Sequence, residues 1–313
     1  MDFCHLHLHT SQSKLDGFGF PIDHAKRAKK LGFKYLGCTD HGNIDGLIDF
    51  QNACEKSNII PILGCEAYIV KDYSVKTSPR HITIWIKNQT GFKNLCTLLS
   101  IANLKGFYYK PRIDFQSLLK HYKGLIVGSA CIKSFVSTPE GEIFLKQLKR
   151  KMKDDLYLEV MPNDMEKQIK HNRLIKRLSK KYGIKIILTN DNHYIKSGES
   201  IIQEILLAIQ SKVKWDNPNR WKFDVKGLYL RSTKEMINAA KEVKIYKKEY
   251  LENTLEVAKK CEAFRIKRRK IQLPKLSFVK EEEESKFLLK LCTKNFKKSL
   301  EIVSKLISYI ISD

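Results

Sequence analysis

Short apolar runs alternate with longer amphipathic segments from residue 1 to about residue 195, and this alternation restricts the folds open to the chain. The amphipathic segments repeat apolar residues at i, i+3 and i+4, which predicts helices. Strands that alternate with helices pair in parallel, because each helix carries the chain back across the sheet. Seven strands are predicted, in the runs FCHLHLH, YLGCT, IIPILGCEAYIV, HITIWIK, GLIVGSA, LYLEV and IKIILTN.

Seven parallel strands favour a closed barrel over a short open sheet. The expected fold class is therefore α/β: a distorted seven-stranded, TIM-like β/α barrel at residues 1–198. Residues 199–264 predict a mostly helical extension that packs on the barrel. A basic run followed by an acidic run around one proline predicts a linker at 265–284. An amphipathic pattern predicts a helical tail at 285–313.

Composition excludes some classes of protein. Of 313 residues, 42% are apolar and 29% are charged, which excludes wholesale disorder. The 58 Lys and Arg residues outnumber the 34 Asp and Glu residues, giving a net charge of +24. Such an excess predicts attraction to a polyanion, most commonly nucleic acid. A lysine- and isoleucine-rich proteome explains the excess about as well, so charge alone does not decide function.

The expected location is the cytoplasm, away from membranes. No apolar run approaches the roughly 18–20 residues that span a bilayer. The first residues, MDFCHLHLHT, lack the basic and apolar regions of a secretory signal. The eight cysteines are scattered and form no CxxC pair, so most are predicted to be small buried hydrophobes in a reducing compartment. Cys131 is the exception, because it directly follows a predicted strand.

Histidine and acidic residues gather at the ends of the predicted strands. His5, His7 and His9 recur with a period of two in the first strand, so their side chains share one face. The sequence Thr-Asp-His-Gly at 39–42 follows the second strand. Further candidates come from the other strands: Cys65 and Glu66 in the third, His81 at the start of the fourth, Cys131 after the fifth, and Asp191 and His193 after the seventh.

These side chains are expected to meet, because the C-terminal ends of barrel strands converge on one rim. Imidazole and carboxylate together suit zinc, manganese or iron, and a thiolate favours zinc. The candidates exceed what one tetrahedral ion uses, so two or three divalent ions are predicted, with Glu66 as a bridge. Each residue alone also fits a core histidine, a turn, a helix cap or a buried cysteine. Their number at strand ends favours the metal site.

The motifs HLHLHT, LDG, TDHG, GCEAY, the His81 strand, SAC and TNDNHY, in this order, resemble the polymerase and histidinol phosphatase (PHP) domain. The finer resemblance is to the version at the N-terminus of bacterial DNA polymerase III alpha subunits. It extends outside the metal motifs and covers about residues 1–275, including 106–114, 206–212, 217–223 and 253–262. Several collinear motifs make this resemblance more specific than HxH alone.

The resemblance implies a complete set of nine metal ligands. His7, His9, Glu66 and Asp191 would hold the first ion. Glu66 would bridge to a second ion held by His81 and Cys131, and a third would lie between Asp16, His41 and His193. Glu66, Asp191 and His193 are the residues expected to matter most for catalysis. Arg112, in YKPRID, is a candidate contact for the substrate phosphate, with an ordinary surface salt bridge as the alternative. His5 is expected to be structural.

The implied reaction is metal-assisted phosphoester hydrolysis. In the polymerase-linked branch this implies a 3′–5′ exonuclease that proofreads a primer end in DNA replication. DNA is then the expected partner, with a separately encoded polymerase core or other replisome subunits. The run SKFLLKLCTKNFKKSL resembles the entry to a polymerase palm, yet the sequence stops at Asp313, so the chain is not expected to polymerise DNA.

Two other functions remain open on the sequence. The first is a small-ester phosphatase of the histidinol phosphatase kind, which residues 106–114 and 206–223 disfavour because they resemble the polymerase branch. The second is a non-catalytic module that docks or stabilises a polymerase, as the N-terminal piece of a split or truncated alpha subunit. Intact ligands do not exclude this module, because bound metal ions can be purely structural.

Overall fold

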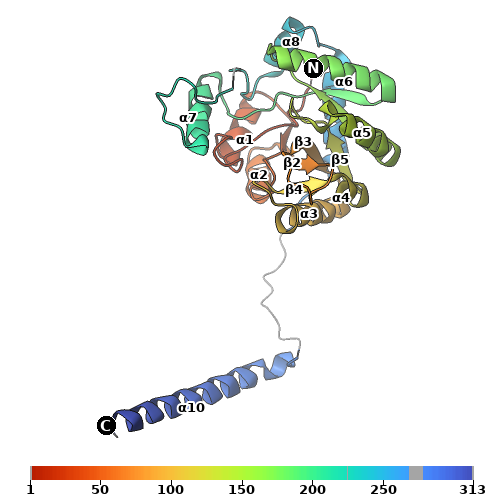
Figure 1. The fold of residues 1–313 in the computed structure, drawn as a ribbon. Coiled ribbons are helices and arrows are strands. Elements are labelled where there is room, and N and C mark those ends of the chain that lie inside the picture. Colours follow the sequence, from red (N-terminus) through yellow and green to blue (C-terminus); the bar gives the residue numbers. More distant parts are fainter. Residues whose placement is uncertain (1, 224, 268–277, 312–313) are drawn as a thin grey trace. The chain divides into compact units, whose positions relative to one another are not determined.

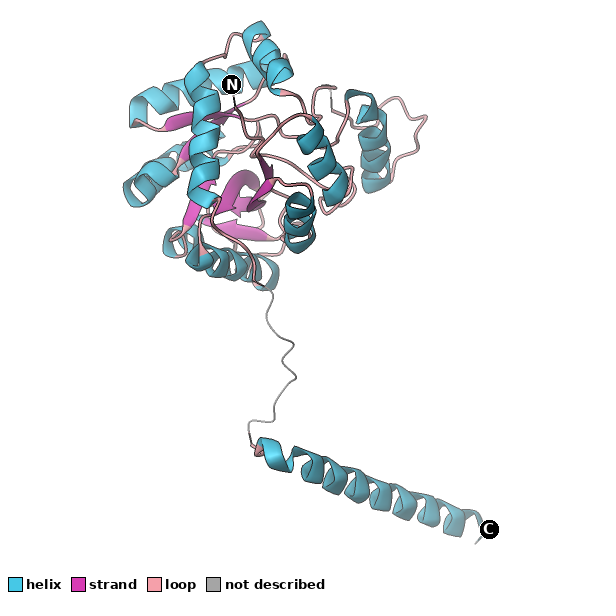
Figure 2. Ribbon diagram, turned by 180° about the vertical axis from the view of Figure 1, so that it is seen from behind, coloured by secondary structure: helices cyan, strands magenta, loops and turns pink. Residues whose placement is uncertain are grey.

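The computed structural model of the chain describes residues 2–223, 225–267 and 278–311. The chain divides into two compact units, Met1–Ile266 and Lys267–Asp313. In the first unit the strands lie at the centre and helices surround them (Figures 1 and 2). In the second unit the described part is the short 3₁₀ turn Glu281–Glu283 and the long helix α10, Glu284–Ile311.

The described residues contain seven strands in two sheets. The five-stranded sheet runs in the order β1–β2–β3–β5, and β4 pairs with β2; β6 and β7 form the second sheet. The β2–β3 and β3–β5 pairs are antiparallel, and the other pairs are parallel. The strand bounds are β1 Tyr35–Cys38, β2 Ile60–Val70, β3 Arg80–Ile86, β4 Arg112–Asp114, β5 Leu125–Gly128, β6 Tyr157–Val160 and β7 Lys185–Leu188.

The α/β class is confirmed, whereas the closed, all-parallel seven-stranded barrel is not. β3 runs antiparallel because only residues 71–79 connect it to β2, and a crossover back to a parallel position needs a dozen or more residues. Among the described residues, only isolated bridges link the two sheets. Val127 of β5 pairs with Leu156, which directly precedes β6. The first segment pairs with β1 through His5 and Leu36, and with the residues after β7 through Leu8 and Asn192.

The first segment, residues 3–9, is not the regular strand that the sequence predicts. Its backbone alternates between two neighbours: His5 O accepts from Gly37 N at 2.7 Å, and His9 N donates to Asn192 O at 2.8 Å. Leu8 N donates to the side-chain hydroxyl of Thr39 at 3.1 Å, so a side chain takes the place of a backbone carbonyl of a neighbouring strand. Shared pairing of this kind satisfies the backbone without building a continuous ladder on either side.

Helices cover the outside of the sheets, and they fall on amphipathic segments between the strands, as in α1, α2 and α6. α6 ends at Gly183, whose φ of 60° suits a left-handed C-cap. The helix bounds in the described chain, besides α10, are α1 Pro21–Lys30, α2 Leu47–Lys56, α3 Gln89–Leu104, α4 Phe115–Lys120, α5 Pro139–Met152, α6 Glu166–Tyr182, α7 Ser200–Ser211, α8 Thr233–Glu242 and α9 Lys248–Cys261.

The core has an inner and an outer part. The outer part lies between the sheets and the helices and contains most of the buried Leu, Ile and Phe residues. The inner part lies among the strands, with Trp85 and Tyr157 as its largest side chains. α9 completes this inner part with Val257, Ala258 and Cys261. Packing on α9 therefore ties the predicted extension, residues 199–264, to the sheets.

The predicted division into four parts stays a prediction, because the structure shows two units rather than four. The extension belongs to the same unit as the sheets. Much of the predicted linker, residues 268–277, lies outside the described residues. The predicted tail falls on α10, whose Leu288, Leu289 and Phe296 are exposed. Within the described residues, no helix is long and apolar enough to cross a bilayer.

Candidate metal centre

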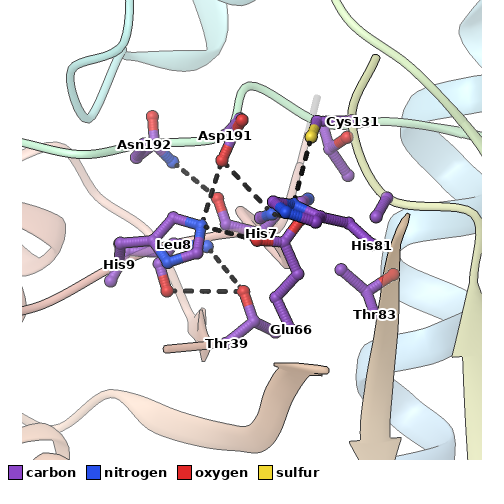
Figure 3. Close-up of polar contacts among 12 residues, drawn as sticks. His7, Leu8, His9, Thr39, Glu66, His81, Thr83, Cys131, Asp191 and Asn192 are labelled. Atoms are coloured by element: carbon purple, nitrogen blue, oxygen red, sulfur yellow. Dashed lines mark hydrogen bonds and ion pairs between the residues drawn. The ribbon is translucent and has the colours of Figure 1, made fainter. Parts of the chain in front are cut away.

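Glu66, on β2, lies at the centre of a group of histidines that come from distant parts of the chain (Figure 3). Its Oε1 lies 3.3 Å from His7 Nε2 and 3.1 Å from His81 Nδ1. Its Oε2 lies 2.7 Å from His41 Nδ1 and 3.6 Å from His9 Nε2. One carboxylate thus faces four imidazoles, with two on each oxygen, which is the arrangement that a bridging ligand requires.

The other predicted ligands complete the same cluster. Asp191 Oδ1 lies 3.0 Å from His9 Nε2 and 3.2 Å from His7 Nε2. Asp16 approaches His41 at 3.3 Å and His193 at 3.5 Å. Cys131 Sγ lies 3.6 Å from His81 Nδ1. The structure therefore brings all nine predicted residues together, although they come from seven separate segments.

Three groups within this cluster hold ligand atoms within 4.8 Å of one another: His7, His9 and Glu66; His41, Glu66 and His81; and His9, His41 and His193. The first two overlap with the predicted first and second ion sites. The third shares His41 and His193 with the predicted third site and adds His9, while Asp16 lies 3.3 Å from His41 and 3.5 Å from His193. Neighbouring groups share His9, His41 and Glu66, so the cluster suits several adjacent ions rather than one.

Several buried atoms of the cluster lie close to one another but form no hydrogen bond of good geometry among the described residues. They are His7 Nε2, His41 Nδ1, both carboxylate oxygens of Glu66, and His193 Nε2. An unsatisfied buried polar atom costs about 1–3 kcal/mol, so five in one place call for a ligand. Nitrogen and carboxylate oxygen atoms of this kind are the ligands that zinc, manganese and iron prefer. The residues present therefore fit divalent metal ions.

The charges of the cluster are interdependent. Burial favours neutral carboxylates, but His81, His7 and His41 outweigh it and hold the pKa of Glu66 well below its usual value. Burial also opposes a charge on His41, yet Glu66 and Asp16 raise its pKa to about 10. Burial, with His41 and His193 beside it, lowers the pKa of His9 to about 4. Ionised carboxylates are thus available as metal ligands.

A residue that the sequence analysis missed orients His7. Glu159, on β6, is fully buried, and its Oε2 lies 3.0 Å from His7 Nδ1. Its carboxylate also accepts hydrogen bonds from Thr83, from Ala130 N at 2.7 Å and from Thr189 at 2.9 Å. Because Nδ1 donates to Glu159, a neutral His7 ring carries its lone pair on Nε2, the nitrogen that faces the cluster. The sequence feature that could have indicated this role is the carboxylate of Glu159 inside the otherwise apolar run LYLEV.

His9 is held by a second chain of polar groups. Its Nδ1 lies 3.0 Å from Ser13 Oγ, which donates to Asp40 Oδ1 at 2.7 Å. Asp40 also accepts from Thr10 N at 2.7 Å and from Thr10 Oγ1 at 2.8 Å. Asp40 is part of the Thr-Asp-His-Gly motif, so the motif supplies both a candidate ligand, His41, and a support for another. These hydrogen bonds therefore fix the position of the His9 ring within the fold.

The backbone is left-handed next to several candidate ligands. Asp191 itself has φ 53°, Ala130 before Cys131 has φ 59°, and Leu15 before Asp16 has φ 62°. Such conformations are uncommon for residues other than glycine, and they gather at functional sites. The turn at Asp191 also means that the segment 189–193 is not extended, as a shared face for Asp191 and His193 would require. Both side chains reach the cluster all the same.

Arg112 has a different position from the one predicted. Its side chain is buried at 2% exposure, and its guanidinium donates to four backbone carbonyls: Gly106 at 2.8 Å, Val75 at 2.7 Å, Thr77 at 3.0 Å and Tyr73 at 2.7 Å. It neither faces a substrate nor forms a surface salt bridge, so both predicted roles are wrong. The motif YKPRID places a buried cation that holds the loop between β2 and β3.

His5 lies outside the cluster, as expected of a structural residue. Its Nε2 lies 2.8 Å from Arg231 O, and its Nδ1 lies 2.9 Å from Asn192 Nδ2. Burial lowers the pKa of His5 to about 4, so the ring is neutral. Both ring nitrogens are occupied by the protein, in contrast to His7, where one nitrogen is unpartnered.

The cluster opens into a cavity of about 660 Å³. Asp16, His41, His81, Cys131, Asp191 and His193 reach its wall, while His7, His9 and Glu66 lie deeper. The rest of the wall mixes neutral polar and apolar side chains with basic and aromatic ones, the latter being Lys14, Lys110, Lys133, Lys167, Lys222, Tyr68, Trp221 and Phe223. A cavity with these walls suits an anionic ligand larger than a single phosphate group.

The fold and the cluster define an α/β domain with a candidate metal site, and the sequence comparisons identify its family. The family model of the PHP domain matches residues 5–163, about half of the chain, so the chain belongs to the PHP domain family. The match contains seven of the nine predicted ligands and ends before Asp191 and His193. The recognised family is therefore confirmed.

Curated relatives are DNA polymerase III alpha subunits. The subunit of Helicobacter pylori is 37% identical over 280 residues, which cover 83% of this chain and 23% of that protein. The subunit of Borreliella burgdorferi is 34% identical over 279 residues, with coverage of 84% and 24%. The chain thus spans about a quarter of the length of these relatives.

Solved structures are similar only in part. A protein from Bifidobacterium adolescentis has a TM-score of 0.44 at 15% identity, covering 61% of this chain and 88% of that one. An amidohydrolase from Chromobacterium violaceum has a TM-score of 0.41 at 13% identity, covering 61% and 87%.

Proposed function

We propose that this chain is a metal-dependent phosphoesterase that removes nucleotides from the 3′ end of DNA, in association with a replicative polymerase. The observation that carries the proposal is the set of five buried nitrogen and oxygen atoms that form no hydrogen bond of good geometry, beneath an open cavity whose wall contains several lysines. The likeness to DNA polymerase III alpha subunits supports DNA as the substrate.

In this proposal the nine residues of the cluster would hold two or three divalent ions, and Glu66 would be shared between two of them. Bound ions would act as Lewis acids that activate water and neutralise a phosphate group. The protein contributes the orientation of its ligands: Glu159 fixes His7, and the Ser13–Asp40 pair supports His9. His193 Nδ1 donates to Asp191 O at 2.8 Å, so a neutral His193 ring would carry its lone pair on Nε2 and could bind an ion there.

The lysines of the cavity would attract the substrate. Lys110, Lys133, Lys167 and Lys222 are exposed, and within the described chain none of them forms an ion pair with an acidic side chain. Unpaired cations around a concave site focus its positive potential and draw in a polyanion. A small phosphate ester needs fewer of them.

The test is a denaturing gel of 5′-labelled single-stranded and primer–template DNA, incubated with purified protein and manganese, zinc or EDTA. We expect metal-dependent shortening from the 3′ end that Asp191→Ala abolishes. Asp45→Ala removes an exposed carboxylate of the same kind and serves as the matched control. Equal shortening by Asp191→Ala and wild type would overturn the assignment of the site.

Two further results would replace the proposal with one of its rivals. Cleavage of p-nitrophenyl phosphate without cleavage of DNA would indicate a small-ester phosphatase. Stoichiometric metal binding without hydrolysis of either substrate would indicate a docking or stabilising module.

A further inference from the structure

Two aromatic side chains connect the rim of the cavity to the metal cluster. Trp221 is 50% exposed, and its ring centroid lies 4.9 Å from that of Phe223, at an interplanar angle of 61°. The Phe223 ring in turn lies 5.5 Å from His193. The three rings therefore form a continuous line from solvent to a candidate ligand, and Trp221 and Phe223 both line the cavity.

Cations accompany the aromatic rings. Lys133 Nζ lies 5.8 Å from the ring centroid of Trp221, and Lys110 Nζ lies 5.4 Å from that of Tyr68. Both lysines line the cavity, and Lys133 follows Cys131 by two residues. Aromatic faces interleaved with cations along a groove are typical of sites for single-stranded nucleic acid, where bases stack and phosphates pair with lysine.

The other exposed tryptophan has a local partner already. The Arg220 guanidinium lies 4.0 Å from the ring centroid of Trp215, and Arg220 binds Glu204 at 2.7 Å. Trp215 does not line the cavity. The two residues lie six positions apart and have similar exposure, 46% and 50%. Trp215 is thus a natural control for Trp221.

We propose that Trp221 and Phe223 form a stacking subsite for an unpaired base at the 3′ end of single-stranded nucleic acid, with Lys133 and Lys110 beside its phosphates. The inference rests on the proposed function, because it requires the cavity to take a nucleic-acid end. It adds that the end must be unpaired, since a base within a duplex cannot offer its face to an aromatic ring. Stacking of this kind tolerates any base.

The test measures binding rather than cleavage. Fluorescence anisotropy in EDTA would compare a 5′-labelled oligothymidine with one that is abasic at its last three positions. We expect the abasic oligomer to bind wild type about 5- to 10-fold more weakly, as loss of stacking implies. Trp221→Ala should bring this ratio close to one, Trp221→Phe should restore most of it, and Trp215→Ala should leave it unchanged.

An unchanged ratio in Trp221→Ala would overturn the inference. A ratio that Trp221→Ala abolishes, in a protein that cleaves no DNA, would support the subsite and overturn only the proposed hydrolysis. Cleavage by a protein that binds both oligomers equally would do the reverse. A parallel series with oligouridine and oligodeoxyuridine, which share the base and differ only in the sugar, distinguishes the two polymers: we expect the base effect in both, and tighter binding identifies the preferred sugar.

Discussion

The carboxylate of Glu159 lies 3.0 Å from His7 Nδ1 and so determines which nitrogen of His7 faces the cluster. Replacing Glu159 with Gln keeps the shape of the side chain and removes its charge. We expect metal affinity to fall roughly 10- to 100-fold, as is usual when the partner of a metal-bound histidine is lost. Isothermal titration with zinc or manganese would measure it, with Glu166→Gln as an exposed control. Unchanged affinity would show that Glu159 only supports the fold.

Metal binding should stabilise the folded chain, because it satisfies atoms that are otherwise buried without partners. At a metal concentration 100-fold above Kd, the free energy of unfolding should rise by about 2.7 kcal/mol. Thermal unfolding with zinc, manganese or EDTA would report the shift. Asp191→Ala should lose most of it, whereas His121→Ala, outside the three ligand groups, should keep it. Identical melting in metal and in EDTA would contradict the metal centre.

Arg112 should matter for stability rather than for substrate binding. Its guanidinium holds the carbonyls of Tyr73, Val75 and Thr77, and the compact ammonium of lysine cannot reach all three. We expect both Arg112→Ala and Arg112→Lys to lose roughly 2–4 kcal/mol of unfolding free energy. Urea denaturation would measure the loss, and limited proteolysis should cut first within residues 71–79. The exposed Arg80→Ala is the control. Loss of DNA affinity at full stability would restore a substrate role for Arg112.

His24 should make stability depend on pH. Burial lowers its pKa from 6.5 to about 4 in the folded chain. Between these values the unfolded chain binds a proton that the folded chain does not, so stability falls as pH falls from about 6.5 to 4. The full effect is about 3 kcal/mol. Urea denaturation in EDTA at pH 7 and pH 5 should show a smaller loss for His24→Gln than for wild type. Equal losses would mean that His24 titrates normally.

The candidate ligands could be found from the sequence because each stands at a strand end or in a short motif. Period two placed His7 and His9 together, and parallel pairing of β1 with β2 and of β6 with β7 made their carboxyl ends converge. The candidate ligands still converge on one edge of the sheet although β3 runs antiparallel. His81 still reaches Glu66, because it stands at the start of an antiparallel strand and thus at the same edge.

Local patterns were enough to predict the α/β class, most strand positions and the residues that gather in the cluster, because these depend on periodicity and on neighbours along the chain. Three features emerge only in three dimensions: residues 3–9 share their pairing between two neighbours, Arg112 is buried, and Glu159 orients His7. Those outcomes depend on which distant groups meet. Glu159 and His7 are 152 residues apart, and a hydrogen bond between residues so distant does not depend on the periodicity of either segment.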